Sequence, residues 1–92
     1  MIRVRGHLRC MTADEAAAVA AHVADHIALS RAEPGCLSFH IVATDDPIVW
    51  ALDETFRDRP AFDAHQARTR DSAWFAATRS VLRDLRIEDL PD

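Results

Sequence analysis

The sequence predicts one small α+β domain, in which helices cover one face of a four-stranded antiparallel sheet. Four short segments alternate between apolar and polar residues, as half-buried strands do, and segments of helical character separate them. The chain has 92 residues, which is the length of one domain. We therefore expect a single domain over residues 1–92.

The first strand is expected over residues 2–10. Its two alternating sets are Ile2, Val4, Leu8 and Cys10 on one side, and Arg3, Arg5, His7 and Arg9 on the other. Period two with β-branched residues predicts a strand with one buried and one polar face.

A long amphipathic helix is expected over residues 13–32. Thr12 and Glu15 form a capping box, because the Thr12 hydroxyl can accept from the Glu15 N–H while the carboxylate reaches back. Val19, Val23 and Ile27 follow at a spacing of four and mark the buried stripe. Pro34-Gly35 ends the helix and turns the chain.

A hairpin is expected next, from strands over residues 36–44 and 48–57 joined by a turn at Asp45-Asp46-Pro47. The second of these strands places its larger apolar residues and one carboxylate on the same face: Ile48, Trp50, Leu52, Glu54 and Phe56.

The last third is predicted to be helical and then extended. Asp58 can cap a helix whose first turn contains Pro60. A break is expected between Thr69 and Ser72, followed by a second helical stretch over 72–84 and a short strand over 85–90. The order β-α-β-β-α-β is that of ferredoxin-like folds.

Composition excludes several classes of function. Apolar residues make up 49% and charged residues 28%, as in globular proteins, and the net charge of −4 disfavours sequence-independent nucleic-acid binding. No apolar run approaches the ~18 residues of a membrane span. Without a signal-peptide pattern, we expect a cytoplasmic protein with reduced thiols at Cys10 and Cys36.

A partner chain is expected on the face of the sheet that the helices leave bare. The strand over 48–57 also carries Val49 and Ala51 on its second side, so apolar residues on both sides need to be buried against another layer. Domains this small need disulfides, a metal or a partner chain for additional stability, and the first two are weakly supported here. The sequence therefore predicts a homodimer.

Four segments resemble the antibiotic biosynthesis monooxygenase (ABM) domain family. They are the turn Glu33-Pro34-Gly35-Cys36, the strand end Glu54-Thr55-Phe56-Arg57-Asp58, the segment Ala61-Phe62-Asp63-Ala64-His65 and the pair Trp74-Phe75. The family pattern has an E-P-G-C turn, then E-x-[FWY]-x-D, then A-[FL]-x-x-H, and then an aromatic residue after a short gap. All four pieces are present in order.

This resemblance implies a dimeric α+β barrel with one pocket per subunit between sheet and helices. It implies a monooxygenase that oxidises a small aromatic or quinol-type substrate with dioxygen and needs no cofactor. In such members the substrate is deprotonated to a carbanion or phenolate that reacts with dioxygen. A non-catalytic ligand-binding or stress-related dimer and an isomerase of a small keto compound remain the alternatives, because a fold does not fix a function.

His65 matches the family histidine and is a candidate base, or the residue that orients the base, because histidine titrates near neutral pH. Glu54 lies among aromatic residues and therefore needs a partner, for which His65 or an arginine is the candidate. The alternative is that the two residues form a structural pair.

His7 and Arg5 share the polar side of a central strand, where they can accept an anionic substrate or stabilise an oxyanion. The alternative is a set of ion pairs with Asp53, Glu88 or Asp89. His40, on the polar side of the second strand, can face either a pocket or the dimer seam.

Trp50, Trp74 and Phe75 are candidates for the walls of an aromatic pocket, with simple core packing as the alternative. His22 and His26 are four residues apart on one helix and lack a third ligand, so we expect an exposed or partner-facing edge and no metal. Only two glycines are present, too few for a phosphate-binding loop. No histidine follows Trp74-Phe75, which disfavours the haem ligation of related proteins.

Overall fold

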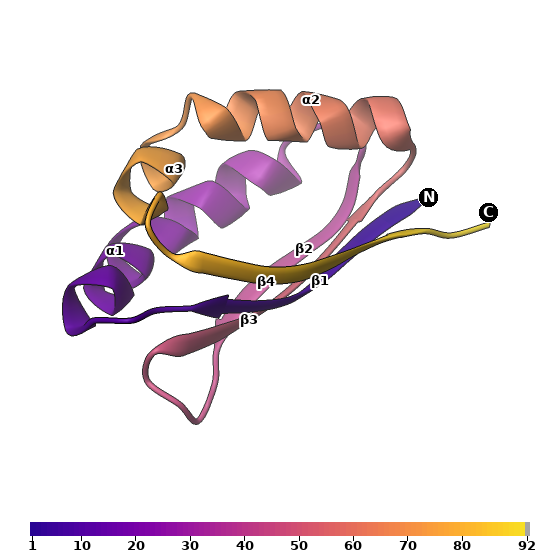
Figure 1. Ribbon diagram of the computed structural model, residues 1–92. Coiled ribbons are helices and arrows are strands. Elements are labelled where there is room, and N and C mark those ends of the chain that lie inside the picture. The colour runs from indigo at the N-terminus through magenta and orange to yellow at the C-terminus, as the bar shows by residue number, and fades with distance from the viewer. Residues whose placement is uncertain (92) are drawn as a thin grey trace.

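The computed structural model describes residues 1–91. Its elements, in chain order, are β1 (Ile2–Arg9), α1 (Ala13–Arg31), β2 (Cys36–Ala43), β3 (Val49–Phe56), α2 (Arg59–Arg70), α3 (Ala73–Thr78) and β4 (Leu82–Asp89). The helices lie together on one side of the sheet (Figure 1). Within the described chain, every helix is too short or too polar to span a bilayer.

The four strands form one antiparallel sheet in the order β2-β3-β1-β4. This confirms the predicted ferredoxin-like arrangement, with β1 and β3 in the centre. Register pairs Val4 with Glu54 and Leu8 with Trp50, so these side chains share the face that the helices cover. Arg5 pairs with Asp53 on the opposite face, which we call the outer face.

The hydrophobic core fills the space between the sheet and the helices. Its largest fully buried side chains include Phe39, Phe56, Ile2 and Leu8. Both predicted helix caps are confirmed: Thr12 accepts from the Glu15 N–H at 3.1 Å, and Asp58 accepts from the Ala61 N–H at 2.9 Å.

The expected helix over 72–84 is wrong in its second half. Helix α3 ends at Thr78, and the chain from Leu82 onward is already strand β4. The Arg83 guanidinium donates to the carbonyl oxygens of Thr78 and Val81, which helix continuation would otherwise use. Pairing of Leu82 and Arg83 with β1 therefore replaces helical hydrogen bonds with ladder hydrogen bonds, a tertiary effect that local periodicity does not report.

Gly6 allows β4 to approach β1 closely. Its φ of +149° lies in a region that side-chain-bearing residues rarely adopt, and an added Cβ would lie 2.1 Å from the Asp84 carbonyl oxygen. Leu52 and Leu85 flank this glycine on the neighbouring strands.

Candidate functional site

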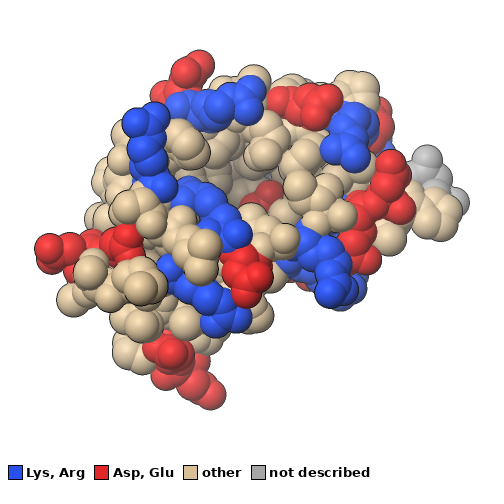
Figure 2. Space-filling view, in the orientation of Figure 1, with Lys and Arg blue, Asp and Glu red and all other residues tan. Residues whose placement is uncertain are grey.

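A cavity of about 290 Å³ lies between the sheet and the helices. All four strands contribute to it, as do α1, α2 and α3. The surface between α2 and β4 is hollowed, and basic side chains lie around the hollow (Figure 2). Its titratable and aromatic lining residues are His26, Glu54, Phe62, His65, Arg70, Trp74, Phe75 and Arg83.

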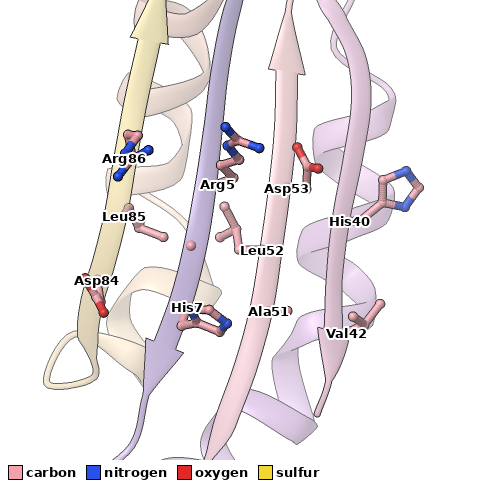
Figure 3. A pocket seen from close by; sticks show the side chains of 11 residues that line it. Arg5, His7, His40, Val42, Ala51, Leu52, Asp53, Asp84, Leu85 and Arg86 are labelled. Atoms are coloured by element: carbon pink, nitrogen blue, oxygen red, sulfur yellow. The ribbon is translucent and has the colours of Figure 1, made fainter.

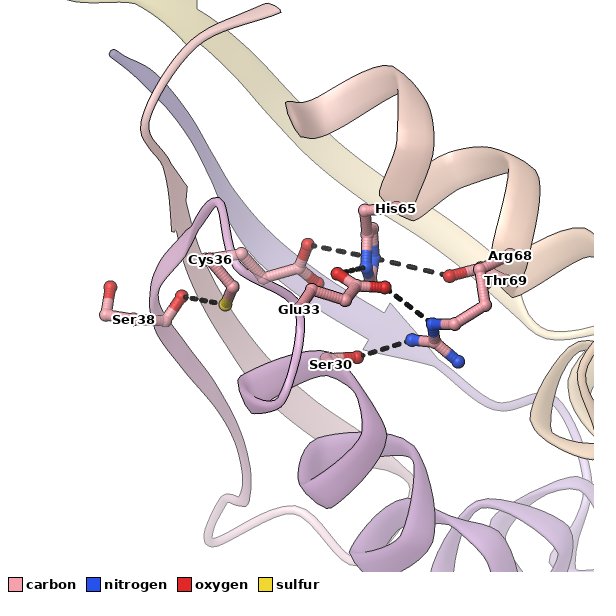
Figure 4. Close-up of polar contacts among 8 residues, drawn as sticks. Ser30, Glu33, Cys36, Ser38, His65, Arg68 and Thr69 are labelled. Atoms are coloured by element: carbon pink, nitrogen blue, oxygen red, sulfur yellow. Dashed lines mark hydrogen bonds and ion pairs between the residues drawn. The ribbon is translucent and has the colours of Figure 1, made fainter. Parts of the chain in front are cut away.

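His65 projects from α2 and is 3% exposed. Its Nδ1 lies 2.9 Å from Glu33 Oε1, and its Nε2 lies 3.3 Å from the Thr69 hydroxyl (Figure 4). The second oxygen of Glu33 accepts from Arg68 Nε at 2.5 Å, and the Arg68 guanidinium also donates to Ser30. Glu33 thus connects the turn after α1 to helix α2 through two side chains.

These contacts fix the protonation of the His65 ring. A carboxylate ion-paired with Arg68 only accepts hydrogen bonds, so Nδ1 carries the proton that Glu33 receives. Burial lowers the pKa of His65, while the bond to Glu33 opposes that shift. The neutral imidazole therefore presents an unprotonated Nε2 on the side of Thr69 and Glu54.

Glu54 projects from β3 and is 6% exposed. Its Oε1 lies 3.8 Å from His65 Nε2, beyond hydrogen-bond distance. Within residues 1–91, no hydrogen bond to its carboxyl group is formed. Burial, with smaller contributions from Glu33 and Asp53, raises the pKa of Glu54 to about 8. The cavity thus holds a protonated carboxyl group beside an unprotonated imidazole nitrogen.

His26 is a cavity residue, and the expectation of an exposed or partner-facing edge is wrong for it. The side chain is 4% exposed, and its ring stacks on Trp74 with centroids 4.7 Å apart and planes 2° apart. Burial, together with the charges of His65, Arg68 and Arg83, lowers the pKa of His26 to about 3. The neutral ring therefore acts as an aromatic wall.

A signal for His26 was present in the sequence. Helix α1 buries Val19, His26 and Ser30, and it half-buries Val23. These positions follow the alternating spacing of four and three that one helix face requires. A spacing of four alone selects Val19, Val23 and Ile27 as the buried positions and leaves His26 out.

Phe75 and Arg83 form the cavity wall at α3 and β4. The guanidinium groups of Arg79 and Arg83 lie over the Phe75 ring, 5.4 Å and 5.8 Å from its centroid. Burial lowers the pKa of Arg83. Sequence reasoning did not select Arg83, because a single arginine in an alternating strand carries no distinguishing pattern.

Arg5, His7 and His40 lie away from this cavity, on the outer face of the sheet (Figure 3). There they line a shallow groove of about 650 Å³. Arg5 donates to Glu88 at 2.9 Å, one of the ion pairs that the sequence offered as an alternative, and His40 Nδ1 lies 3.3 Å from the Arg31 guanidinium.

The sheet thus divides the predicted site residues into two groups. His65, Glu54, Trp74 and Phe75 meet at the cavity, and Arg5, His7 and His40 gather on the other side. Trp50 lies on the helix-covered face and packs against the core, but it is not among the residues that line the cavity.

A metal centre has no obvious ligand set in the described part of the chain. No group of three or more His, Cys, Asp or Glu side chains in residues 1–91 is arranged to hold an ion. The distance between the His26 and His65 ring centroids is 5.9 Å, and the rings pack on aromatic neighbours.

Solved structures share this fold. A Deinococcus radiodurans protein assigned to the antibiotic biosynthesis monooxygenases superposes with a TM-score of 0.81 at 19% identity, over 100% of this chain and 94% of that chain. SnoaB, a cofactor-independent oxygenase from Streptomyces nogalater, gives 0.78 at 14% identity, over 99% and 93%. Rv0793 from Mycobacterium tuberculosis gives 0.73 at 24% identity, over 99% and 95%.

Membership of a family follows from the sequence itself. No protein of curated function matches it significantly. The family model for antibiotic biosynthesis monooxygenase matches residues 1–77, which contain the E-P-G-C turn, both helix caps, His65 and Trp74. On this match, the chain belongs to the antibiotic biosynthesis monooxygenase family.

Proposed function

We propose that this protein is a cofactor-independent monooxygenase that oxidises a small aromatic or quinol-type compound with dioxygen in the interior cavity. One observation carries the proposal: His65 Nε2 and the Glu54 carboxyl group, 3.8 Å apart, border the same aromatic-walled cavity. A flat ring fits between such walls, and the two groups supply a base and an acid beside it.

The reaction begins with removal of a substrate proton by His65 Nε2. The resulting carbanion or phenolate donates electrons to dioxygen, and a peroxide forms on the substrate carbon. For a ring methylene, one oxygen atom stays as the new carbonyl oxygen, and the other leaves as water with the two hydrogens that the methylene loses. Glu54, protonated at neutral pH, is placed to return a proton to the leaving oxygen.

Burial supports this chemistry. His65 and Glu54 are 3% and 6% exposed, so few water molecules compete for the substrate anion. The hydrogen bond from His65 Nδ1 to Glu33 stabilises the imidazolium that forms when Nε2 takes the proton. The carboxylate in a Ser-His-Asp triad stabilises its histidine in the same way.

We further propose that the protein works as a homodimer joined through the outer face. In a single chain this face is bare of helices, and Val42 and Leu82 on it are 54% and 55% exposed. Light scattering after size exclusion tests this. Val42→Glu and Leu82→Glu are expected to shift the mass from two chains to one, and a single-chain mass for the parent protein contradicts the proposal.

Oxygen uptake tests the reaction. Metal-stripped protein is mixed with a panel of hydroquinones and anthrone-like phenols, and uptake is compared with the autoxidation rate. Glu54→Gln and His65→Gln are expected to lower the rate about 10²-fold or more. His22→Gln on α1, outside the cavity lining, is the matched control, and His7→Ala tests the outer face as an alternative site.

Three results would assign a different site or a different function. Loss of activity in His7→Ala alone, with the two-chain mass retained, moves the site to the outer face. Saturable binding without uptake identifies a binding protein, and solvent proton exchange into a ketone without oxygen use identifies an isomerase.

A further inference from the structure

Two arginines line the cavity, and within residues 1–91 neither of them has an acidic side chain as a partner. They are Arg70, at the end of α2, and Arg83, on β4. Five arginines elsewhere do pair with carboxylates: Arg3, Arg5, Arg9, Arg57 and Arg68. Among the described residues, Arg70 makes no hydrogen bond or ion pair.

Arg83 uses part of its guanidinium group to hold the end of α3. Its NH1 donates to the carbonyl oxygens of Thr78 and Val81, and its NH2 donates to the Thr78 hydroxyl. All three acceptors are neutral, so the positive charge is not compensated. A half-buried cation in this state attracts an anion that reaches it.

The rest of the cavity lining does not neutralise these charges. Among the described residues, Glu54 is the one acidic side chain of the lining, and burial keeps its carboxyl group protonated at neutral pH. His26 and His65 are neutral there. The cavity lining is therefore positive in a chain whose net charge is −4. Figure 2 shows basic side chains around the hollow, with acidic ones among them.

We propose that the cavity selects aromatic compounds bearing a carboxylate, with the ring against Trp74 and Phe75 and the carboxylate at Arg70 and Arg83. Guanidinium groups bind carboxylates through paired hydrogen bonds, and the stacked His26–Trp74 wall accepts a flat ring. The proposal rests on the interior cavity being the substrate site of the proposed monooxygenase, and it narrows the substrate class.

The test uses two probes of equal shape. 2-Naphthoate carries a carboxylate, and 2-naphthamide replaces it with a neutral amide. Equilibrium binding at pH 7 is measured by calorimetry. The parent protein is expected to bind the naphthoate about tenfold more tightly or better, since one charge-assisted contact corresponds to roughly that factor.

Arg70→Gln is the main variant, because Arg70 is exposed and forms no hydrogen bond with any residue of 1–91. It is expected to remove most of the preference for naphthoate and to leave naphthamide binding unchanged. Arg83→Lys keeps the charge but loses the paired guanidinium N–H donors, so it is expected to weaken the preference for naphthoate only in part. The matched control is Arg57→Gln, an exposed arginine that lines neither the cavity nor the outer-face groove and should bind as the parent does.

Equal affinity for the two probes in the parent, or an unchanged preference in Arg70→Gln, overturns the proposal. These outcomes are separable from failure of the proposed reaction, because binding needs no turnover. Oxygen uptake that is equally fast with neutral and acidic quinols contradicts only the proposed preference for a carboxylate. Preferential binding of the carboxylate without oxygen uptake contradicts only the proposed monooxygenase reaction.

Discussion

His65 and Glu33 are 32 residues apart in sequence, and His65 Nδ1 lies 2.9 Å from Glu33 Oε1. The bond joins the turn before β2 to helix α2. It leaves the other ring nitrogen without a proton and directs it to the cavity. The E-P-G-C turn and the helix histidine, two of the segments in which the sequence resembles the family, are therefore in direct contact.

Replacing Glu33 by Gln is expected to lower the pKa of His65, because the Glu33 carboxylate is the group that raises it against the effect of burial. Loss of the charge also weakens the contact to Arg68. We expect a decrease of about 1–3 kcal/mol in the free energy of unfolding. An NMR titration of the His65 Hε1 resonance and urea unfolding measure the two effects. Asp45→Asn, in an exposed turn, should change neither, and a raised His65 pKa would contradict the assignment.

Replacing Glu54 by Gln is expected to stabilise the protein at alkaline pH. The folded state holds the Glu54 proton up to a pKa of about 8, against an ordinary 4.5, so the parent loses stability as pH rises between these values. Gln has no charge to bury. The variant's advantage in the free energy of unfolding should therefore grow across that window, by an amount on the order of a few kcal/mol. Urea unfolding from pH 4 to pH 9 measures it, and a constant difference would show that Glu54 has no raised pKa.

Replacing His26 by Phe is expected to make the protein more resistant to acid. The folded state keeps this imidazole neutral down to a pKa of about 3, while the unfolded chain binds a proton near 6.5. Stability is therefore lost as pH falls through this range in the parent. Phe preserves the ring that packs on Trp74 and carries no proton. Circular dichroism against pH should place acid unfolding of the variant at lower pH. His22→Gln, one turn earlier on α1, serves as the control and should keep the parent's midpoint.

Replacing Gly35 by Ala is expected to destabilise the fold by about 1–3 kcal/mol through overpacking. An added Cβ would lie 2.3 Å from Ala61 Cβ, because the turn packs directly on the first turn of α2. The double variant with Ala61→Gly removes the colliding atom and should recover part of the loss. Urea midpoints of the two single variants and the double variant measure the coupling. Strictly additive losses would show that the two residues do not meet.

Sequence patterns predicted the local structure well where one local signal dominated. Alternation in residues 2–10 and the caps at Thr12 and Asp58 are confirmed, because they depend on neighbours in the chain. The helix predicted over 72–84 failed because Leu82 and Arg83 pair with β1, about seventy residues away in sequence.

The candidate site was predicted in part. His65, Glu54, Trp74 and Phe75 were selected from family motifs and do meet at the cavity. In the sequence Glu33 is part of a turn motif, and nothing local indicates that it is the partner of His65, 32 residues away. The pattern of α1 predicts an edge position for His26, since helical spacing alone does not show that Trp74 covers this polar residue.

The sequence by itself determined the order of the elements, the polar and apolar faces of each strand and the membership of the family, because periodicity, capping and motifs are local properties. The tertiary structure alone decided which titratable groups share one cavity and which lie behind the sheet. Strand register placed Glu54 on the covered face and Arg5 on the outer face, and helix packing placed His26 and His65 beside Glu54. Burial then set their protonation, since the pKa of a side chain depends on the water and charges around it and not on its place in the chain.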